Sequence, residues 1–441
     1  MQNDLTLESW GRFPAALHSG EIVPRSIDEV RNSMRSVDAS LLPRGMGRSY
    51  GDSCLNDGGY LLSTKRLDKF MHFAPDTGVL RCESGVTLDE ILRVFVPQGW
   101  FLPVTPGTKY VTIGGAIAND IHGKNHHREG TFSNHVIRFE LERSDGTRFL
   151  CSRDENRDWF RATVGGIGLT GVILWAELKL RPIAGPYIEM ESIKFDSLDE
   201  FFQISHSSGG LFEYTVSWLD CLSSNDVRGL FMRGNHIDKE EKAELKITHK
   251  TSQWKTFPCD APSYLLSTPS IKLFNFIYYN KQLNKIKKSI VHYDPFFYPL
   301  DSINHWNRMY GKSGFLQWQC AVPVNDNYEA IRLILRKIHK SGLGSFLVVF
   351  KEFGNHPSEG MLSFPMSGIT LAMDFPNREK KIFSFLDRLD EVVVDVRGRI
   401  YPAKDARMSR NTFRASFPSV NEFTSYIDPK FSSSFYRRVG G

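Results

Sequence analysis

Apolar residues recur at helical spacing in two segments of the chain. In the first segment, Thr87 and Glu90 form a capping box, which marks a helix start. Its apolar face consists of Leu88, Ile91, Leu92 and Phe95. The second segment, residues 328–340, has its apolar positions at Ile331, Leu333, Ile334 and Ile338. We therefore predict two amphipathic helices that bury these faces.

Alternating and uninterrupted apolar runs predict strands elsewhere. Residues 135–142 alternate through Ile137, Phe139 and Leu141, and residues 148–152 alternate again after a Ser-Asp-Gly-Thr turn. This pattern predicts a β-hairpin. Buried strands are expected at 345–350 and 369–373, and the run 391–396 is also strand-like.

Composition adds a division of the chain. Glycine is dense between residues 43 and 182, and aromatic residues become frequent beyond them. We expect a ligand-cradling domain followed by a second domain that begins near residue 186. With 441 residues, of which 41% are hydrophobic and 24% charged, the chain is too long for one small module and too apolar for a disordered one.

Charge and cysteine content exclude several classes of protein. The formal net charge of +5 is too small over this length to indicate a nucleic-acid binder. The six cysteines lie far apart and form no C-x-x-C pair, so neither a zinc knuckle nor a disulfide framework is expected. The N-terminal segment lacks a basic flank before an apolar run, and the uncharged stretch 163–176 is too short for a membrane span. We expect a cytoplasmic protein.

The first candidate for chemistry is a loop with three glycines. Backbone that turns this tightly aims successive amides at one point and binds phosphate oxygens, and Arg44 and Arg48 add charge suited to a pyrophosphate. A glycine-rich surface turn is the alternative. The loop consists of Pro43, Arg44, Gly45, Met46, Gly47, Arg48, Ser49, Tyr50, Gly51, Asp52 and Ser53.

A second loop contains a literal G-x-G-x-x-G at Gly166, Gly168 and Gly171. In a Rossmann fold this motif must open a helix. Here residues 172–180 are β-rich, so we expect the glycines to lead into a strand. Close approach of the backbone to a flat ligand and a simple turn remain equal alternatives.

The third loop, residues 106–127, joins glycines to polar residues. Asp120, His122, His126 and His127 would suit a metal cluster, since histidines four apart can share a helical face. Gly123 and the absence of the glutamate of H-E-x-x-H argue against it. A glycine-lined ligand loop that ends in polar site residues is favoured, and no metal is expected.

Together these loops read R-G-x-G-R-S-Y-G-D, P-G-T-x(4)-I-G-G-A-I-A-x-D-I-H-G-K-N-H-H and G-G-x-G-x-T-G-V-I. They resemble flavoproteins of vanillyl-alcohol oxidase type, and within that family the oxidase subunits of decaprenylphosphoryl-β-D-ribose 2'-epimerases. D-I-H-G-K-N-H-H and W-N-R-x-Y-G are typical of this branch, whereas the glycine loops are typical only of the flavin fold. The resemblance continues through residues 214–220, 298–301, 306–311, 315–319, 362–366 and 401–405.

The resemblance implies an α+β fold in which a two-part FAD-binding domain carries an inserted antiparallel-sheet substrate domain. Residues 1–185 would form the FAD-binding domain, 186–397 the substrate-binding domain, and 398–441 a C-terminal segment that returns to the FAD domain. The implied activity is oxidation of the 2'-hydroxyl of a polyprenyl-phosphoryl-β-D-ribofuranose to the keto sugar, the first half of epimerisation to the arabinose form used in cell-wall arabinan.

The resemblance also assigns residues to FAD and to the substrate. The FAD residues would be the loop 43–53 together with Gly107, Thr112, Ile113, Gly114, Gly115, Asn119, Asp120, Ile121, His122, Ile173 and Tyr401. The substrate residues would be Lys124, Trp218, Tyr310, Gln317, Gln319, Lys351 and Phe353.

Oxidation of an alcohol needs a base for the hydroxyl proton as well as a hydride acceptor. Lys404 is the leading candidate base, provided that burial or a neighbouring cation lowers its pKa. A salt bridge to Asp405 or another carboxylate is the structural alternative. His122 would orient the flavin or the substrate, and its own alternative is a core histidine with satisfied hydrogen bonds.

The chain departs from its relatives at three positions. Ala372 stands where mycobacterial members carry a cysteine, and Thr370 stands where an asparagine is usual. Many flavoproteins of this type tether FAD through a histidine in the first glycine loop, and Arg48 occupies that place here. We therefore expect noncovalent FAD and no role for a thiol at position 372.

Two other functions compete with this hypothesis. An FAD-dependent oxidase of free sugars, alditols or aldonolactones would share the fold. The aromatic and lysine-rich segment 270–298 suits an anionic lipid surface and hence peripheral contact with the inner membrane, or else forms a solvated helix face over an aromatic core. A nucleic-acid binder would use the same segment but is disfavoured. The expected partners are a lipid-linked sugar phosphate and a separate NAD(P)H-dependent short-chain reductase.

Overall fold

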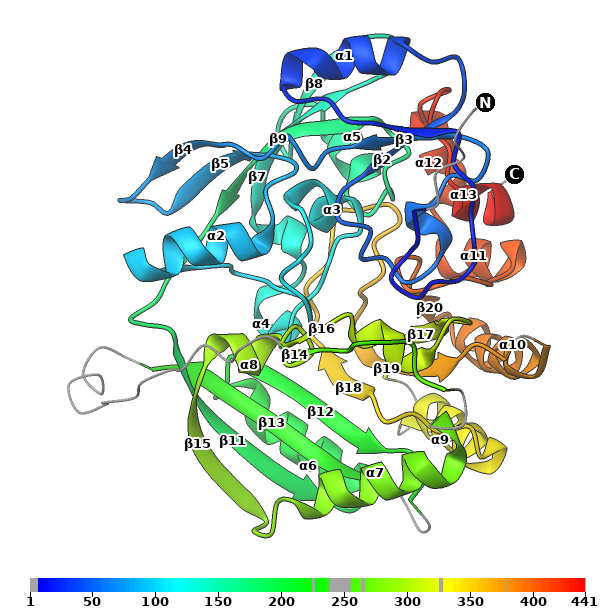
Figure 1. Cartoon of the computed structure of the whole chain (residues 1–441). Helices are drawn as coiled ribbons and strands as arrows, with labels where there is room; N and C mark the ends of the chain where they lie inside the picture. The colour runs from blue at the N-terminus through cyan, green and yellow to red at the C-terminus, as the bar shows by residue number, and fades with distance from the viewer. Residues whose placement is uncertain are drawn as a thin grey trace.

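The computed structural model describes residues 7–223, 227–237, 255–262, 266–324, 328–378 and 380–440. The elements of the first 182 residues form the upper half of Figure 1 around two sheets. A parallel sheet has the order β1 (Gly20–Ile22), β3 (Tyr60–Ser63), β2 (Leu41–Arg44). An antiparallel sheet has the order β4 (Phe70–Ala74), β5 (Val79–Glu83), β9 (Val172–Lys179), β7 (Val136–Glu142), β8 (Arg148–Ser152).

In the described residues of this half, five α-helices and a two-stranded ladder complete the structure. The helices are α1 (Ile27–Arg35), α2 (Leu88–Phe95), α3 (Ile113–Ala118), α4 (His126–Glu129) and α5 (Arg157–Thr163). Strands β6 (Trp100–Phe101) and β10 (Arg181–Pro182) pair antiparallel. The helix α2 begins with the predicted capping box of Thr87 and Glu90, and all four predicted apolar residues are buried. The predicted β-hairpin is β7 and β8, and the G-x-G-x-x-G motif leads into strand β9, as expected.

The lower half is built on an antiparallel sheet of eight strands (Figure 1). Their order is β15 (Ile286–His292), β11 (Tyr187–Phe195), β13 (Arg228–His236), β12 (Tyr214–Asp220), β18 (Val348–Phe353), β19 (Gly368–Pro376), β17 (Phe315–Val322), β20 (Arg399–Ile400). With the helices, this sheet confirms the α+β class.

Side chains alternate between the two faces of this sheet because successive residues of a strand point in opposite directions. One face carries the largest hydrophobic core, with Leu219, Trp318, Phe350 and Leu371 packed under α6 (Leu198–Gly209), α9 (Glu329–Ser341) and α10 (Lys380–Asp395). The other face meets the upper half and supports α7 (Thr268–Asn280) through Trp218, Leu230 and Tyr279. The short elements α8 (Tyr293–Phe297), β14 (Lys255–Thr256) and β16 (Ile303–Asn304) lie at the junction between the two halves (Figure 1).

Several sequence predictions are wrong in detail. Ile137 is exposed and Val136 is buried instead, because the register of β7 against β9 shifts between Val136 and Arg138. Leu333 points outward from α9, although its three predicted partners are buried. The strand expected at 345–350 begins only at Val348.

The strand-like run 391–396 is also corrected, because it forms the end of helix α10. Its valines continue a helical face that starts earlier in α10. The buried positions of that face are Ile382, Phe385, Leu386, Leu389, Val392 and Val393. A run of valines at a helix end therefore has the same pattern as a strand if the two preceding helical turns are not considered.

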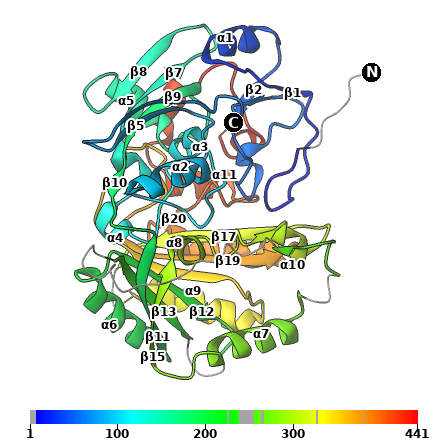
Figure 2. The ribbon, with the colours of Figure 1, turned by 60° about the vertical axis from the view of Figure 1, so that its left-hand side comes forward.

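The C-terminal segment contacts both halves. Helices α11 (Arg410–Ser416), α12 (Val420–Phe423) and α13 (Ser434–Val439) lie beside the blue N-terminal elements in Figures 1 and 2, and Leu41 forms a bridge with Phe431. Strand β20 pairs with β17 of the large sheet. The division at 185 and 397 stays a prediction. Among the described residues, no helix is long and apolar enough to cross a membrane.

Candidate active site

A cavity lies between the glycine loops of the upper half and one face of the eight-stranded sheet. The structure brings to it most of the predicted FAD and substrate residues. These are Pro43, Arg44, Gly45, Met46, Gly47, Arg48, Ser49, Tyr50, Ser53, Gly107, Thr112, Gly114, Gly115, Asn119, Ile121, His122, Lys124, Ile173, Gln317, Gln319, Lys351, Tyr401 and Lys404.

Seven predicted residues lie outside this lining. Gly51 lies just before a short 3-10 helix, and Ile113 is the first residue of α3 and is buried in a hydrophobic core. Asp120 accepts hydrogen bonds from Ser358, Ser363 and the Ser133 amide, and Asp52 pairs with Arg438. The remaining three are Trp218, Tyr310 and Phe353.

Two of these three still support the cavity. Phe353 packs against the His122 ring, with 4.9 Å between ring centroids. Trp218 packs on Tyr278 of α7 and donates its indole N–H to the Phe346 carbonyl at 2.9 Å. These rings form the cavity's second layer.

The first glycine loop is shaped for close approach to a ligand. Gly47 has a φ of +61°, and a Cβ there would lie 2.1 Å from the Arg44 guanidinium. A Cβ on Gly45 would lie 2.3 Å from the Thr112 hydroxyl, which caps α3 by accepting from the Gly115 amide. A side chain at Gly45 or Gly47 would therefore collide with Thr112 or Arg44 and disturb the loop that lines the cavity.

Several polar atoms of the cavity lining have no protein partner within the described residues. Buried and unpaired are the Nε atoms of Arg44 and Arg48 and the hydroxyls of Ser53 and Ser84. The Arg48 guanidinium is held over the Trp10 and Tyr110 rings, 4.2 and 5.3 Å from their centroids. Buried donors of this kind require a polar ligand, and a glycine cradle with two arginines fits the pyrophosphate of FAD.

The sheet contributes the opposite wall through residues that are in register. Gln319 of β17 and Val349 of β18 both pair with Ala372 of β19, and Lys351 pairs with Thr370. Because paired residues point to the same side of a sheet, these side chains form one surface that faces the glycine loops.

His122 lies at the junction of the two walls. Its Nδ1 is 3.0 Å from the Lys351 amine, and its Nε2 is 3.0 Å from the Gln319 side-chain amide. Burial and the adjacent Lys351 hold the pKa of His122 well below its usual range. With both ring nitrogens engaged by the protein, the imidazole is a neutral positioning group.

Three lysine amines share this cavity. Burial and, to a smaller extent, the nearby Lys124 together lower the pKa of Lys351 to about 7. Burial alone lowers the pKa of Lys124 to about 8. Burial also lowers the pKa of Lys404 to about 7, against the opposing effect of Asp374. The Lys404 amine lies 3.6 Å from the centroid of the Tyr50 ring.

Asp374 is a functional candidate that sequence reasoning missed. It lies on β19 and is buried, accepting from the Gln317 amide at 2.5 Å and the Tyr310 hydroxyl at 3.1 Å. Burial raises its pKa to about 6. The available signal was a single carboxylate in the otherwise apolar strand 369–376.

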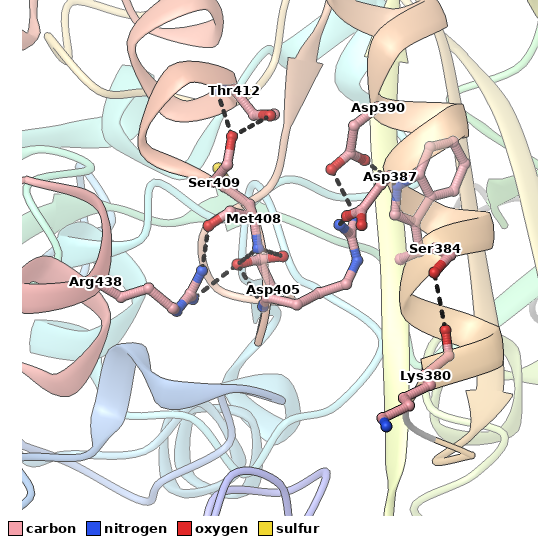
Figure 3. A network of polar contacts seen from close by, with 11 residues as sticks. Lys380, Ser384, Asp387, Asp390, Asp405, Met408, Ser409, Thr412 and Arg438 are labelled. Atoms are coloured by element: carbon pink, nitrogen blue, oxygen red, sulfur yellow. Dashed lines mark hydrogen bonds and ion pairs between the residues drawn. The ribbon is translucent and has the colours of Figure 1, made fainter.

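The salt bridge considered for Lys404 is not formed with its neighbour Asp405. The Asp405 carboxylate accepts from the Met408 amide and pairs with Arg438 at 2.8 Å (Figure 3). Arg438 also pairs with Asp52 at 2.7 Å. Asp405 therefore fixes the backbone beside Lys404, and Arg438 neutralises the charge of the Asp405 carboxylate.

The metal hypothesis has no support in the described residues, which contain no group of three or more histidine, cysteine or carboxylate side chains arranged around an ion. His126 stacks on Phe353 with 4.4 Å between centroids, and His127 contacts the Phe212 carbonyl.

We predict that Arg438→Met lowers the free energy of unfolding by about 3 kcal/mol, because it leaves the buried Asp52 and Asp405 without their cation. Urea unfolding would measure this. Arg414→Met, an exposed arginine of α11, is the control and should change stability by less than about 0.5 kcal/mol. Equal stability of the two variants would contradict the role given to Arg438.

Comparisons with known proteins identify the family. A family model described as an FAD binding domain matches residues 19–152. Decaprenylphosphoryl-beta-D-ribose oxidase of Mycolicibacterium smegmatis is 35% identical over 98% of this chain and 97% of its own length. Delta(24)-sterol reductase of Homo sapiens is 30% identical over 25% of this chain and 22% of its own, and L-gulonolactone oxidase of Mus musculus is 26% identical over 36% of each. The chain therefore belongs to the FAD-dependent oxidoreductases of vanillyl-alcohol oxidase type, in the family that includes decaprenylphosphoryl-beta-D-ribose oxidase.

Proposed function

We propose that this enzyme oxidises the 2'-hydroxyl of a polyprenyl-phosphoryl-β-D-ribofuranose to the 2'-keto sugar. The observation that carries the proposal is the similarity to decaprenylphosphoryl-beta-D-ribose oxidase over 98% of the chain. The sterol reductase and lactone oxidase matches cover far less of it.

The three cavity lysines support an anionic substrate. Lys124, Lys351 and Lys404 have lowered pKa values because burial penalises each ammonium ion. A phosphate group in the cavity would stabilise the charged form of those near it, which a neutral sugar or sterol cannot do. The site thus favours phosphorylated sugars over free alditols or lactones.

FAD, when bound, supplies the hydride acceptor. The chain's own part is to hold the alcohol and to take its proton. With a pKa of about 7, the Lys404 amine is available in its neutral form and can accept the hydroxyl proton. Gln319 and Lys351 fix the His122 ring at hydrogen-bond distance, so that His122 orients the reactants.

Ala372 changes the pocket relative to mycobacterial members. It lines the cavity beside Gln319 and Val349, its partners in the sheet register. A methyl group there provides no thiol, so we propose that turnover needs none and that inhibitors which bond to the cysteine lose their anchor.

The keto sugar requires a second enzyme. In the described residues the G-x-G-x-x-G motif runs into β9, a strand, and so does not form the helix-opening turn that a nicotinamide dinucleotide needs. We propose that a separate NAD(P)H-dependent short-chain reductase returns a hydride to C2' from the opposite face, which completes the epimerisation.

Oxidation of free sugars, alditols or aldonolactones is the second candidate. The match to L-gulonolactone oxidase over 36% of the chain favours it.

We predict noncovalent FAD. Arg48, at the position of the tethering histidine, is held between aromatic rings and has no nucleophilic atom for a flavin bond. Denaturation of the purified holoenzyme followed by filtration should release all yellow colour as FAD. Flavin retained by the precipitated chain, or release of FMN, would be incompatible with this.

Under anaerobic conditions, polyprenyl-phosphoryl ribose should bleach the flavin, since the lysine cavity favours an anionic sugar. Free alditols and aldonolactones should reduce it at least about a hundredfold more slowly at equal concentration. Stopped-flow absorbance would measure both rates. Equal rates would establish the second candidate.

We predict that Lys404→Met retains FAD and slows substrate-driven flavin reduction by about a hundredfold or more, because the proton acceptor is gone. In the wild type the rate should rise with pH to a plateau above about pH 7, as the Lys404 ammonium loses its proton. The variant should lack this rise.

Asp374→Asn is the matched variant for the pH profile. Removing this negative charge lowers the pKa of Lys404 further, so the rise in rate should move to lower pH while the plateau remains. Near-normal reduction in Lys404→Met would exclude Lys404 as base. If Lys404→Met lost FAD, while His122→Ala kept FAD but could no longer be reduced by substrate, His122 would be the base.

A further inference from the structure

Helix α7 presents an apolar face to solvent. Leu273, Phe274, Phe276 and Ile277 are between 45 and 61% exposed, and Leu283 just beyond the helix is 89% exposed. The inner face instead carries Asn275, which is fully buried and donates to Asp220 at 2.9 Å. The exposed face of α7 is therefore largely apolar, and it lies over a core that contains Trp218 and Tyr279.

Lysines lie on α7 and in the segment that follows it. Lys285 and Lys288 pair with Glu200 and Glu191. For Lys272, Lys281 and Lys287, the described residues contain no carboxylate at ion-pair distance, and all three are exposed. The Lys281 amine lies over the Tyr278 ring, 3.7 Å from its centroid. An apolar helix face accompanied by lysines that have no carboxylate partner is complementary to a surface of acyl chains and anionic headgroups.

The patch is continuous with the cavity. Phe274 packs on Phe346 with 5.5 Å between ring centroids, and the next residue, Leu347, lines the cavity. Beneath α7, Trp218 pairs in register with Val349, which also lines the cavity. Packed apolar side chains thus connect α7 to the wall of the cavity.

We propose that the outer face of α7 docks the enzyme on an anionic lipid bilayer, with Leu273, Phe276 and Ile277 entering the interface. Figures 1 and 2 both place α7 at the end of the molecule opposite α1, which leaves this face free to meet a flat surface. A second copy of the chain fits less well, because a two-fold contact through this face would bring lysines against lysines. The inference does not depend on which alcohol is oxidised.

Flotation of the holoenzyme with vesicles tests the proposal without turnover. Vesicles of phosphatidylglycerol mixed with phosphatidylcholine should bind the protein, and vesicles of phosphatidylcholine alone should bind it at least about tenfold more weakly. Phe276→Ser/Ile277→Ser should weaken binding to the anionic vesicles by about tenfold or more, since both side chains lose their apolar contact. Leu17→Ser/Val23→Ser removes two exposed apolar residues of the upper half and should bind like the wild type.

A charge reversal tests the electrostatic part separately. Lys272→Glu/Lys281→Glu should weaken binding by about tenfold or more, whereas Lys380→Glu/Lys381→Glu on α10 should not. Bound FAD and an unchanged unfolding temperature check that each variant is folded. Absence of binding to anionic vesicles, or equal binding by the α7 variants and their controls, would overturn the proposal. A dimer in sedimentation equilibrium that Phe276→Ser/Ile277→Ser abolishes would assign the face to a second copy instead.

Discussion

The cost of burying ammonium groups governs this site. Three lysine amines share one cavity, and burial is the main cause of the lowered pKa of each. Full charge on all three amines would be unfavourable without an anion. The cavity should therefore bind a negatively charged ligand more tightly than a neutral one. The neighbouring groups follow from this cost. Burial and, after it, the adjacent Lys351 lower the pKa of His122, and Asp374 is the buried carboxylate that partly opposes the lowered pKa of Lys404.

Two carboxylates near Lys404 have different roles because they have different partners. Asp405 is its neighbour in sequence, yet its charge is neutralised by Arg438, and its acceptors hold the backbone turn. Asp374 is distant in sequence but faces the cavity from β19, and its hydrogen bonds come from the neutral groups of Gln317 and Tyr310. The negative charge of Asp374 therefore acts on the Lys404 amine and raises its pKa. Asp405 thus holds the backbone, and Asp374 raises the pKa of Lys404 from a distance. The Lys404 amine therefore has no salt bridge that would keep it permanently charged.

The sequence was informative where local chemistry sets the structure. The capping box of α2 and the hairpin β7–β8 depend on neighbours within a few residues, and both are confirmed. Most residues of the glycine loops line the cavity, while their binding of FAD stays a prediction. Errors arose where tertiary contacts decide. The bulge that turns Ile137 outward depends on β9, and the run 391–396 is helical because it extends α10. Asp374 was missed because its importance depends on Lys404, which arrives from a different segment of the chain.

The two faces of the eight-stranded sheet explain why catalysis and docking can share one scaffold. Residues such as Trp318 and Phe350 turn toward α9 and α10 and build the core, which needs no ligand. Their immediate neighbours, Gln319, Val349 and Lys351, turn toward the flavin loops, and Trp218 on the same face supports α7. A one-residue shift of register would exchange these sets and destroy core and site together. The core face therefore fixes the distance between α7 and the cavity, because both lie on the opposite face of the same sheet.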